Sequence, residues 1–306
     1  MAEPRREAFW KPVIGFLVLL LVIGAMAVAG WRWISSQQAP TLRIEVDEQC
    51  VATVNGESFR LNPEPARNAG IIAAEGMRRG LPARAVTIAL ATAMQESSLR
   101  NIDHGDRDSV GLFQQRPSQG WGTVDQIMDP WYSAGKFYEA LVKVPGWQTG
   151  DVNDIAQKVQ RSGHPDAYRK HEPMARAWAS ALTGHSPGAI GCVRHDPAST
   201  MTTLNTVLAK AHGTKAKVTA HPQGLVITAS DPVVLWSSVH LAMSQYDQVR
   251  FVRVEVAGRA WAHDDYSVAA WGALPTPGTS SESPSGGSTS EPLPASGPTT
   301  AVLALG

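Results

Sequence analysis

The sequence has few cysteines and no excess of either charge, and both features limit the classes of protein to which it can belong. Its 306 residues include 2 cysteines, and 27 Lys and Arg residues balance 27 Asp and Glu residues, giving a formal net charge of zero. Without a basic field, the composition does not indicate a nucleic-acid partner. The length is that of one or two domains with a sizeable core.

Several recognisable chemical motifs are also missing. There is no Walker A loop in the chain. Four histidines are spread along polar stretches without the spacing of zinc ligands: His164, His171, His185 and His195. We therefore expect neither a metal nor a cofactor.

One long apolar run lies near the N-terminus. Residues 12–30 carry no charge, and at about 1.5 Å of rise per residue a helix of this length just crosses a bilayer core of roughly 30 Å. Basic residues precede the run and tryptophans flank it, namely Arg5, Arg6, Lys11, Trp10, Trp31 and Trp33. The positive-inside rule then predicts a single-pass anchor in the cytoplasmic membrane, with residues 1–11 in the cytoplasm and the bulk of the chain outside.

A cleaved signal peptide is the alternative to this anchor. Residues 27–29 read Ala-Val-Ala, which fits a small-residue cleavage site. The apolar run is longer than most signal-peptide cores, and this length favours the uncleaved anchor. Both interpretations export the chain.

The two cysteines bracket the central part of the chain. Cys50 lies just before this segment and Cys192 just after it. In an oxidising compartment the two can pair, and we predict a disulfide between them. Closing so long a loop stabilises the fold by about 4–5 kcal/mol in the chain-entropy model. Two free buried thiols are the alternative.

The pattern along the chain predicts several segments. A polar stalk covers residues 31–40. Within residues 41–62, two stretches alternate apolar and polar side chains on either side of Asp-Glu-Gln, and an Asn-Gly-Glu turn follows, which predicts a β-hairpin. Residues 63–192 are predicted to be all-α, with an Ala-rich buried helix over residues 83–98.

The C-terminal third has a different pattern. Helical and strand-like stretches alternate over residues 197–271, which predicts a small α+β accessory domain. We expect this domain to position the exported chain or to bind another cell-envelope protein. Residues 272–306 are rich in Pro, Ser, Gly and Thr, which predicts a disordered tail with a short apolar end.

A single glutamate ends the Ala-rich helix. Glu96 would be partly buried and would face the negative end of the helix dipole, and both effects favour a protonated carboxyl. Such a group can serve as a general acid in glycoside cleavage. A glutamate at a frayed helix end that faces water is the simpler interpretation of this residue taken alone.

The residues after Glu96 favour the functional interpretation of this glutamate over the frayed helix end. Ser97 follows directly, and Gly111, Leu112, Phe113, Gln114 and Pro117 come after a polar stretch of the form "SLRNIDHGDRDSV". This pattern resembles the lysozyme-like lytic transglycosylase family, which includes the goose-type lysozymes. A second likeness is "IMDPWYSAGKFYEAL" over residues 127–141, and the resemblance covers about residues 63–185.

The resemblance implies a mainly α lysozyme-like catalytic domain that cleaves the MurNAc–GlcNAc bond of peptidoglycan strands. Glu96 would be the catalytic acid, and Gln114 and Ser97 would line the sugar site. Gly111 would let the backbone approach the sugar, and Pro117 would fix the turn that leaves the cleft. Trp121, between two glycines, would either stack on a sugar or plug the core.

The sequence departs from the family at a later motif. The family usually has an Ala-x-x-Tyr-Asn-x-Gly stretch whose tyrosine contacts the catalytic region. Here Val159 and Gln160 stand at the Tyr and Asn positions, with Gly163 nearby, and Tyr168 is the candidate substitute. This departure also supports a second hypothesis, in which the domain is a glycan-binding scaffold without catalysis.

Two reactions fit the pattern. A second carboxylate can activate water or stabilise the oxocarbenium ion, and Asp103, Asp106 and Asp108 are candidates. An ordinary solvated turn is the alternative role for these three residues. The resemblance implies that Glu96 alone can suffice, with the 6-hydroxyl of the sugar attacking to form an anhydro product. The sequence does not distinguish this reaction from hydrolysis by a muramidase.

Overall fold

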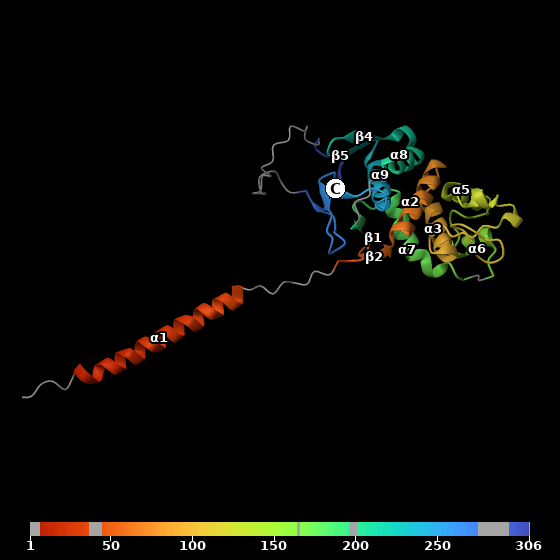
Figure 1. The fold of residues 1–306 in the computed structure, drawn as a ribbon. Coiled ribbons are helices and arrows are strands. Elements are labelled where there is room, and N and C mark those ends of the chain that lie inside the picture. Colours follow the sequence, from red (N-terminus) through yellow and green to blue (C-terminus); the bar gives the residue numbers. More distant parts are fainter. Residues whose placement is uncertain (1–6, 37–44, 164–165, 196–200, 275–293, 306) are drawn as a thin grey trace, which may run out of the picture. The chain divides into compact units, whose positions relative to one another are not determined.

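The fold divides into two units, Met1–Ile44 and Glu45–Gly306, and each is described by itself (Figure 1). The structure is a computed structural model. It describes residues 7–36, 45–163, 166–195, 201–274 and 294–305.

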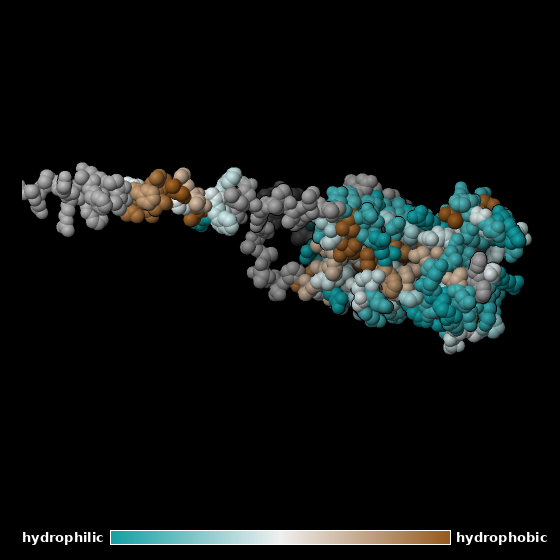
Figure 2. All heavy atoms as spheres, turned by 90° about the horizontal axis from the view of Figure 1, so that it is seen from below, coloured by the Kyte–Doolittle hydropathy of each residue, from teal (hydrophilic) through white to brown (hydrophobic). Residues whose placement is uncertain are grey.

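The first unit is one apolar helix, α1 (Glu7–Ser36). The segment Gly15–Trp33 is long and apolar enough to cross a membrane, and none of it is buried within the protein. Figure 2 shows hydrophobic side chains along this helix, whereas the visible face of the second unit is mostly hydrophilic. The predicted anchor therefore forms a helix of suitable length, and the predicted topology stays a prediction.

Six helices make up the first part of the second unit. They are α2 (Pro63–Arg78), α3 (Ala83–Ser97), α4 (Val124–Ile127), α5 (Pro130–Leu141), α6 (Val152–Gln160) and α7 (Glu172–Leu182). Side-chain caps begin α4, α5 and α6; the Asp129 carboxylate, for example, accepts from the Trp131 N–H and Asp151 accepts from the Asp154 N–H. α3 lies at the centre and packs against α2, α5, α6 and α7. The all-α prediction is thus confirmed for residues 63–182.

A three-stranded sheet joins the two ends of this helical region. β1 (Gln49–Val54) and β2 (Glu57–Leu61) form a hairpin in the second half of the predicted range, closed at the Asn-Gly-Glu turn, while residues 45–48 form no strand. β3 (Ile190–Val193) adds to the other side of β1. Cys50 lies opposite Cys192 in the β1–β3 ladder, and the two are disulfide-bonded as predicted. The sequence analysis missed β3, because a buried four-residue strand has no alternating pattern.

The rest of the unit is a helix pair against a six-stranded antiparallel sheet. The helices are α8 (Met201–His212) and α9 (Pro232–Ser244). The strand order is β4-β5-β9-β6-β7-β8. The strands are β4 (Ala216–His221), β5 (Gly224–Ala229), β6 (Phe251–Val256), β7 (Arg259–Ala262), β8 (Gly272–Ala273) and β9 (Thr300–Leu305).

The prediction of a disordered tail over residues 272–306 is wrong for the described part of that range. Thr300–Leu305 is the central strand β9, which pairs with β5 on one side and with β6 on the other. Ala301 and Leu303 have no exposed surface. The short apolar end is a buried strand. The prediction missed it because the residues before it in sequence are rich in Pro, Ser and Gly. Residues 275–293 lie outside the described residues.

The segment 197–271 is not a separate domain, because its helices share a core with the helical region. α9 packs against α2, α7 and β3, and α8 packs against α2. The Ser237 hydroxyl donates to the Leu182 carbonyl at 2.7 Å. The α9 sequence is apolar on nearly all sides, as expected of a helix buried between layers. Residues 45–305 therefore form one α+β unit.

Candidate functional site

Glu96 is the penultimate residue of α3 and is half-buried. Two left-handed residues follow it, Ser98 at φ 55° and Leu99 at φ 60°. A left-handed conformation is costly for a branched, buried residue such as Leu99. The Asn68 side-chain amide donates to the Leu99 carbonyl at 2.8 Å, which helps to hold the turn. Backbone strain of this kind gathers at functional sites, and here it directly follows the candidate acid.

The Gly-Leu-Phe-Gln motif forms a tight turn next to the end of α3. Val110 and Gln115 close the turn through reciprocal backbone hydrogen bonds of 3.0 Å. Leu112 and Phe113 have no exposed surface, and the Phe113 ring stacks on Phe137 of α5 at 4.6 Å. The two apolar residues thus anchor the turn in the core, which explains why they stand between Gly111 and Gln114.

Ser97 joins the helix end to this turn. Its hydroxyl donates to the Leu112 carbonyl at 2.8 Å and lies 3.1 Å from the Ala93 carbonyl. The side chain is buried. The sequence analysis assigned Ser97 to the sugar site, but the structure gives its hydroxyl a partner inside the protein.

Gly111 and Gln114 are also held within the loop. Gly111 has φ +77°, and a Cβ there would lie 2.8 Å from the Ile127 carbonyl oxygen. The Gln114 amide donates to the His104 carbonyl at 3.2 Å, and its side-chain oxygen occupies the place that a Cβ of Gly105 would need. The need for glycine at position 111 therefore comes from the backbone and from Ile127, and the Gln114 amide braces the polar loop.

Tyr168 reaches the candidate acid. Its hydroxyl donates to Glu96 Oε1 at 2.6 Å, and its side chain has no exposed surface. Burial, together with the hydrogen bond to Glu96, raises the pKa of the Tyr168 hydroxyl well above its usual range. Tyr168 is thus a neutral donor at every ordinary pH, and it determines how the carboxyl group of Glu96 is oriented.

The two residues that depart from the family motif lie at the end of α6. Val159 is buried, and the Gln160 side-chain amide donates to the Phe113 carbonyl at 2.7 Å. Gln160 and Ser97 therefore bond to the same turn, Ser97 at the Leu112 carbonyl and Gln160 at the Phe113 carbonyl. The segment that follows α6 supplies the tyrosine.

The three acidic candidates in the loop after Glu96 make other contacts. Asp108 accepts from the Arg116 guanidinium at 2.7 Å and from the Ser118 N–H at 2.8 Å. These two donors hold the pKa of Asp108 well below its usual range. Asp103 pairs with His104, and the Asp106 side chain is 92% exposed. The described contacts link none of the three to Glu96.

Trp121 is half-buried and packs against the hydrophobic core. The neighbouring Gly122 leaves room for the Tyr132 hydroxyl, which a Cβ would meet at 2.6 Å. These contacts fit the core-plug alternative for Trp121, and its half-exposed surface also leaves part of the ring open. Pro117 begins a short 3-10 helix at residues 117–119, as expected of a turn that leaves the loop.

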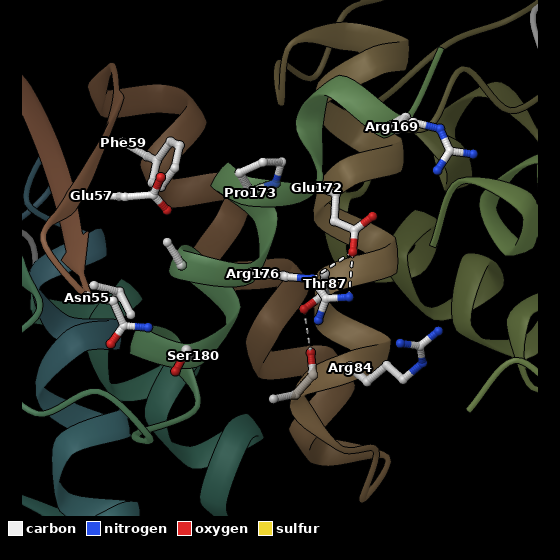
Figure 3. A pocket seen from close by; sticks show the side chains of 13 residues that line it. Asn55, Glu57, Phe59, Arg84, Thr87, Arg169, Glu172, Pro173, Arg176 and Ser180 are labelled. Atoms are coloured by element: carbon white, nitrogen blue, oxygen red, sulfur yellow. Dashed lines mark hydrogen bonds and ion pairs between the residues drawn. The ribbon is translucent and has the colours of Figure 1, made fainter. Parts of the chain in front are cut away.

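A surface hollow of about 680 Å³ lies elsewhere, between the β1–β2 turn and the starts of α3 and α7 (Figure 3). Arg84 and Thr87 line it from α3, and Glu172 and Arg176 point toward each other from α7. Glu96 does not line this hollow. Its arginines and Glu172 have partners inside the protein, so chemistry rather than size identifies the site at Glu96.

Several contributors were missed at the sequence level. Asn153 is buried, and its side-chain oxygen accepts from the N–H groups of Tyr168 and Arg169, each at 3.2 Å. His171 lies 3.0 Å from the Gln95 side-chain oxygen, and burial lowers its pKa. A buried asparagine near the start of a helix was the available signal for Asn153, whereas only the fold brings His171 to Gln95.

Comparison of the sequence with models of protein families and with curated proteins finds no match. Within the described residues, no group of three or more His, Cys, Asp or Glu side chains is placed to hold a metal ion. The case for function therefore rests on the geometry around Glu96.

Proposed function

We propose that the chain is a peptidoglycan-cleaving glycosidase of lysozyme-like fold, with Glu96 as the general acid. The hydrogen bond of 2.6 Å from the buried Tyr168 hydroxyl to Glu96 Oε1 carries this proposal. A structural glutamate at a helix end has no need of a buried neutral donor. A general acid does, because its carboxyl group must keep one orientation through the reaction.

The geometry assigns separate tasks to the two carboxyl oxygens. Tyr168 occupies Oε1, so Oε2 is the atom that carries the proton to the glycosidic oxygen. Proton transfer breaks the C1–O bond and leaves an oxocarbenium-like sugar and an ionised Glu96. The carboxylate then accepts the proton of the attacking hydroxyl, and Glu96 returns to its starting form.

The identity of the attacking hydroxyl group determines which product forms. Asp108 is engaged by Arg116, and Asp103 and Asp106 are exposed. These contacts favour a reaction with a single carboxylate, in which the 6-hydroxyl of the same sugar attacks C1 and gives an anhydro product. Hydrolysis by water, as in a muramidase, is the alternative reaction.

Placement follows from the apolar helix. With α1 in the cytoplasmic membrane and its basic end inside, the second unit would face the cell wall, where its substrate lies. The same placement puts Cys50 and Cys192 in an oxidising compartment, in agreement with their disulfide.

The test uses the full chain in detergent with purified peptidoglycan sacculi. Released fragments are weighed by mass spectrometry for the wild type, for Glu96→Gln and for the matched control Glu139→Gln on the surface of α5. We expect anhydro-muropeptides from the wild type and the control, and at least about a 100-fold lower yield from Glu96→Gln. Reducing muropeptides would retain Glu96 as the acid and change the attacking group to water.

The competing proposal is a glycan-binding scaffold. It is favoured by Val159 and Gln160, which replace the Tyr-Asn pair of the family motif, since Gln160 is bound to the Phe113 carbonyl. If the wild type and Glu96→Gln pellet equally with sacculi and neither releases fragments, the chain is a scaffold and the proposed catalysis is wrong.

A further inference from the structure

The segment that carries Tyr168 is attached to the first turn of α6. Asn153 Oδ1 accepts from the backbone N–H groups of Tyr168 and Arg169, each at 3.2 Å. Two donors on one oxygen fix which side of the amide group is the acceptor. Asn153 has 1% of its surface exposed, so solvent does not replace either bond.

We propose that Asn153 is a positioning residue that holds Tyr168 against Glu96. This inference rests on the proposed function for its effect on rate, but the geometry that it asserts can be measured without activity. Asn153 is 15 residues before Tyr168, and the described hydrogen bonds link it to Glu96 through that tyrosine. It therefore acts on Glu96 indirectly, by fixing the position of the Tyr168 backbone.

Other contacts of the same helix make this assignment specific. The Asp151 carboxylate pairs with the exposed Arg169 side chain at 3.0 Å, which is a surface ion pair of small expected effect. At the other end of α6, Gln160 holds the Phe113 carbonyl. α6 thus braces both neighbours of Glu96, the tyrosine through Asn153 and the Gly-Leu-Phe-Gln turn through Gln160.

The chemistry explains why an acceptor is needed at this position. A leucine has nearly the shape of asparagine but accepts no hydrogen bond, so two buried N–H groups would lose their partner. The backbone at Tyr168 would then shift to find water or another acceptor. A displacement near 1 Å of a catalytic neighbour lowers a rate by roughly 100-fold. An aspartate keeps the acceptor and should keep Tyr168 in place. The Asn153→Asp variant also carries Asp154→Asn, because the Asp154 carboxylate accepts from the Asn153 amide at 3.3 Å and would otherwise face a second carboxylate.

The activity-independent test follows the Tyr168 ring by NMR in full-length protein labelled with 13C at tyrosine Cζ. The chain has 5 tyrosines, and Tyr168→Phe identifies the signal. We expect Glu96→Gln and Asn153→Leu to move this signal, and Asn153→Asp to leave it near the wild-type position. Should Asn153→Leu not fold, Asn153→Ala removes the same acceptor without a branched side chain.

The rate test is a double-mutant cycle on the release of muropeptides. Asn153→Leu should lower kcat by roughly 10- to 100-fold with little change in KM. In a Tyr168→Phe background the same substitution should lower kcat less than about twofold, since the contact that it positions is already gone. A merely structural role would give the same loss in both backgrounds.

The outcomes separate the two proposals. An unmoved Tyr168 signal in Asn153→Leu, or equal losses of kcat in both backgrounds, would overturn the role of Asn153. A Tyr168 signal that moves as expected in a protein that releases no muropeptides would support the positioning contact and would refute the glycosidase.

Discussion

The helical region around Glu96 and the six-stranded sheet complete their cores in different ways. In the helical region, the core forms around α3, which packs against α2, α5, α6 and α7, and capping bonds or first-turn prolines mark most helix starts. In the sheet, the central strand β9 is the last element of the chain, far in sequence from both β5 and β6. Local signals mark the helices of one region, whereas the central strand of the other comes from a distant segment.

The difference matters because the two regions are joined. α9 lies between them, and His240 of this helix bonds to both the Ala181 carbonyl and the Ala189 N–H of the helical side. A defect in the sheet should therefore reach the candidate site, although no strand of the sheet has a described contact with Glu96. Four predictions test this dependence, in order of decreasing effect.

Removal of residues 294–306 should have the largest effect. The truncation removes β9, whose Ala301 and Leu303 are fully buried, and leaves β5 and β6 with open edges. We expect a loss of more than about 5 kcal/mol in the free energy of unfolding, as much as a whole domain often has. Urea unfolding followed by circular dichroism measures it. The half-buried Leu305→Ala is the control, and an unchanged urea midpoint in the truncation would show that the sheet closes without β9.

Loss of the disulfide should weaken the helical side. With a sequence separation of 142 residues, the Cys50–Cys192 bond restricts a long loop of the unfolded chain. The double variant Cys50→Ala/Cys192→Ala should lose about 4–5 kcal/mol. Thermal unfolding of the wild type with and without reductant gives the comparison, and the double variant should not respond to reductant. Equal stability of all samples would argue against the chain-entropy account.

Acid should weaken the joint between the two regions. Burial lowers the pKa of His240 to about 4, whereas an unfolded histidine titrates near 6.5. Between these values the unfolded state binds more protons, so the stability from neutral His240 is complete above about pH 6.5 and is lost as the pH falls toward 4.

The expected loss is roughly 3 kcal/mol, at about 1.4 kcal/mol for each pH unit between the two pKa values. Urea midpoints at several pH values measure the slope, and His240→Gln should flatten it. His212, whose pKa burial also lowers to about 4, would leave a residual slope. If His240→Gln keeps the full wild-type change of urea midpoint with pH, the acid sensitivity comes from groups other than His240.

A pair of glycines should give the smallest and most informative effects. A Cβ at Gly224 would overlap the Leu303 carbonyl in the β5–β9 ladder, and a Cβ at Gly111 would lie 2.8 Å from the Ile127 carbonyl. We expect Gly224→Ala to lower the free energy of unfolding by about 2 kcal/mol. Gly111→Ala should mainly lower the yield of released muropeptides and should change the free energy of unfolding less. Gly80→Ala, with φ +68° and open space, controls for backbone strain alone. Similar losses of activity in all three variants would show that Gly111 has no special place in the site.

Local patterns mark many helix starts, because a capping side chain or a first-turn proline acts within one turn of the helix. Pro130 follows the Asp129 cap and Pro232 follows the Asp231 cap, and both helices begin where those residues indicate. The pairing of Cys50 with Cys192 also followed from their positions and from export. The spacing of Glu96 from Gly111 and Gln114 indicated a shared site, and the Ser97 bond to Leu112 brings the helix end to the turn.

Contacts between distant segments could not be predicted in the same way. Nothing in the Thr300–Leu305 sequence says that it inserts between β5 and β6, because any apolar strand of that length has the same pattern. The Asn153 bonds to Tyr168 and Arg169 depend on how the chain returns after α6. The Gln114 amide, expected to face a sugar, is held by His104 because the polar loop folds over it.

The sequence by itself determined the apolar N-terminal helix, the limits of the helices around α3 and the choice of Glu96 as the candidate acid, since capping, apolar length and residue spacing are local properties. Only the tertiary structure decided that Tyr168 donates to Glu96, that the C-terminal third shares one core with the helices, and that the last strand closes the sheet. Each of these depends on burying surfaces from distant segments together, and the free energy of that burial is a property of the whole fold.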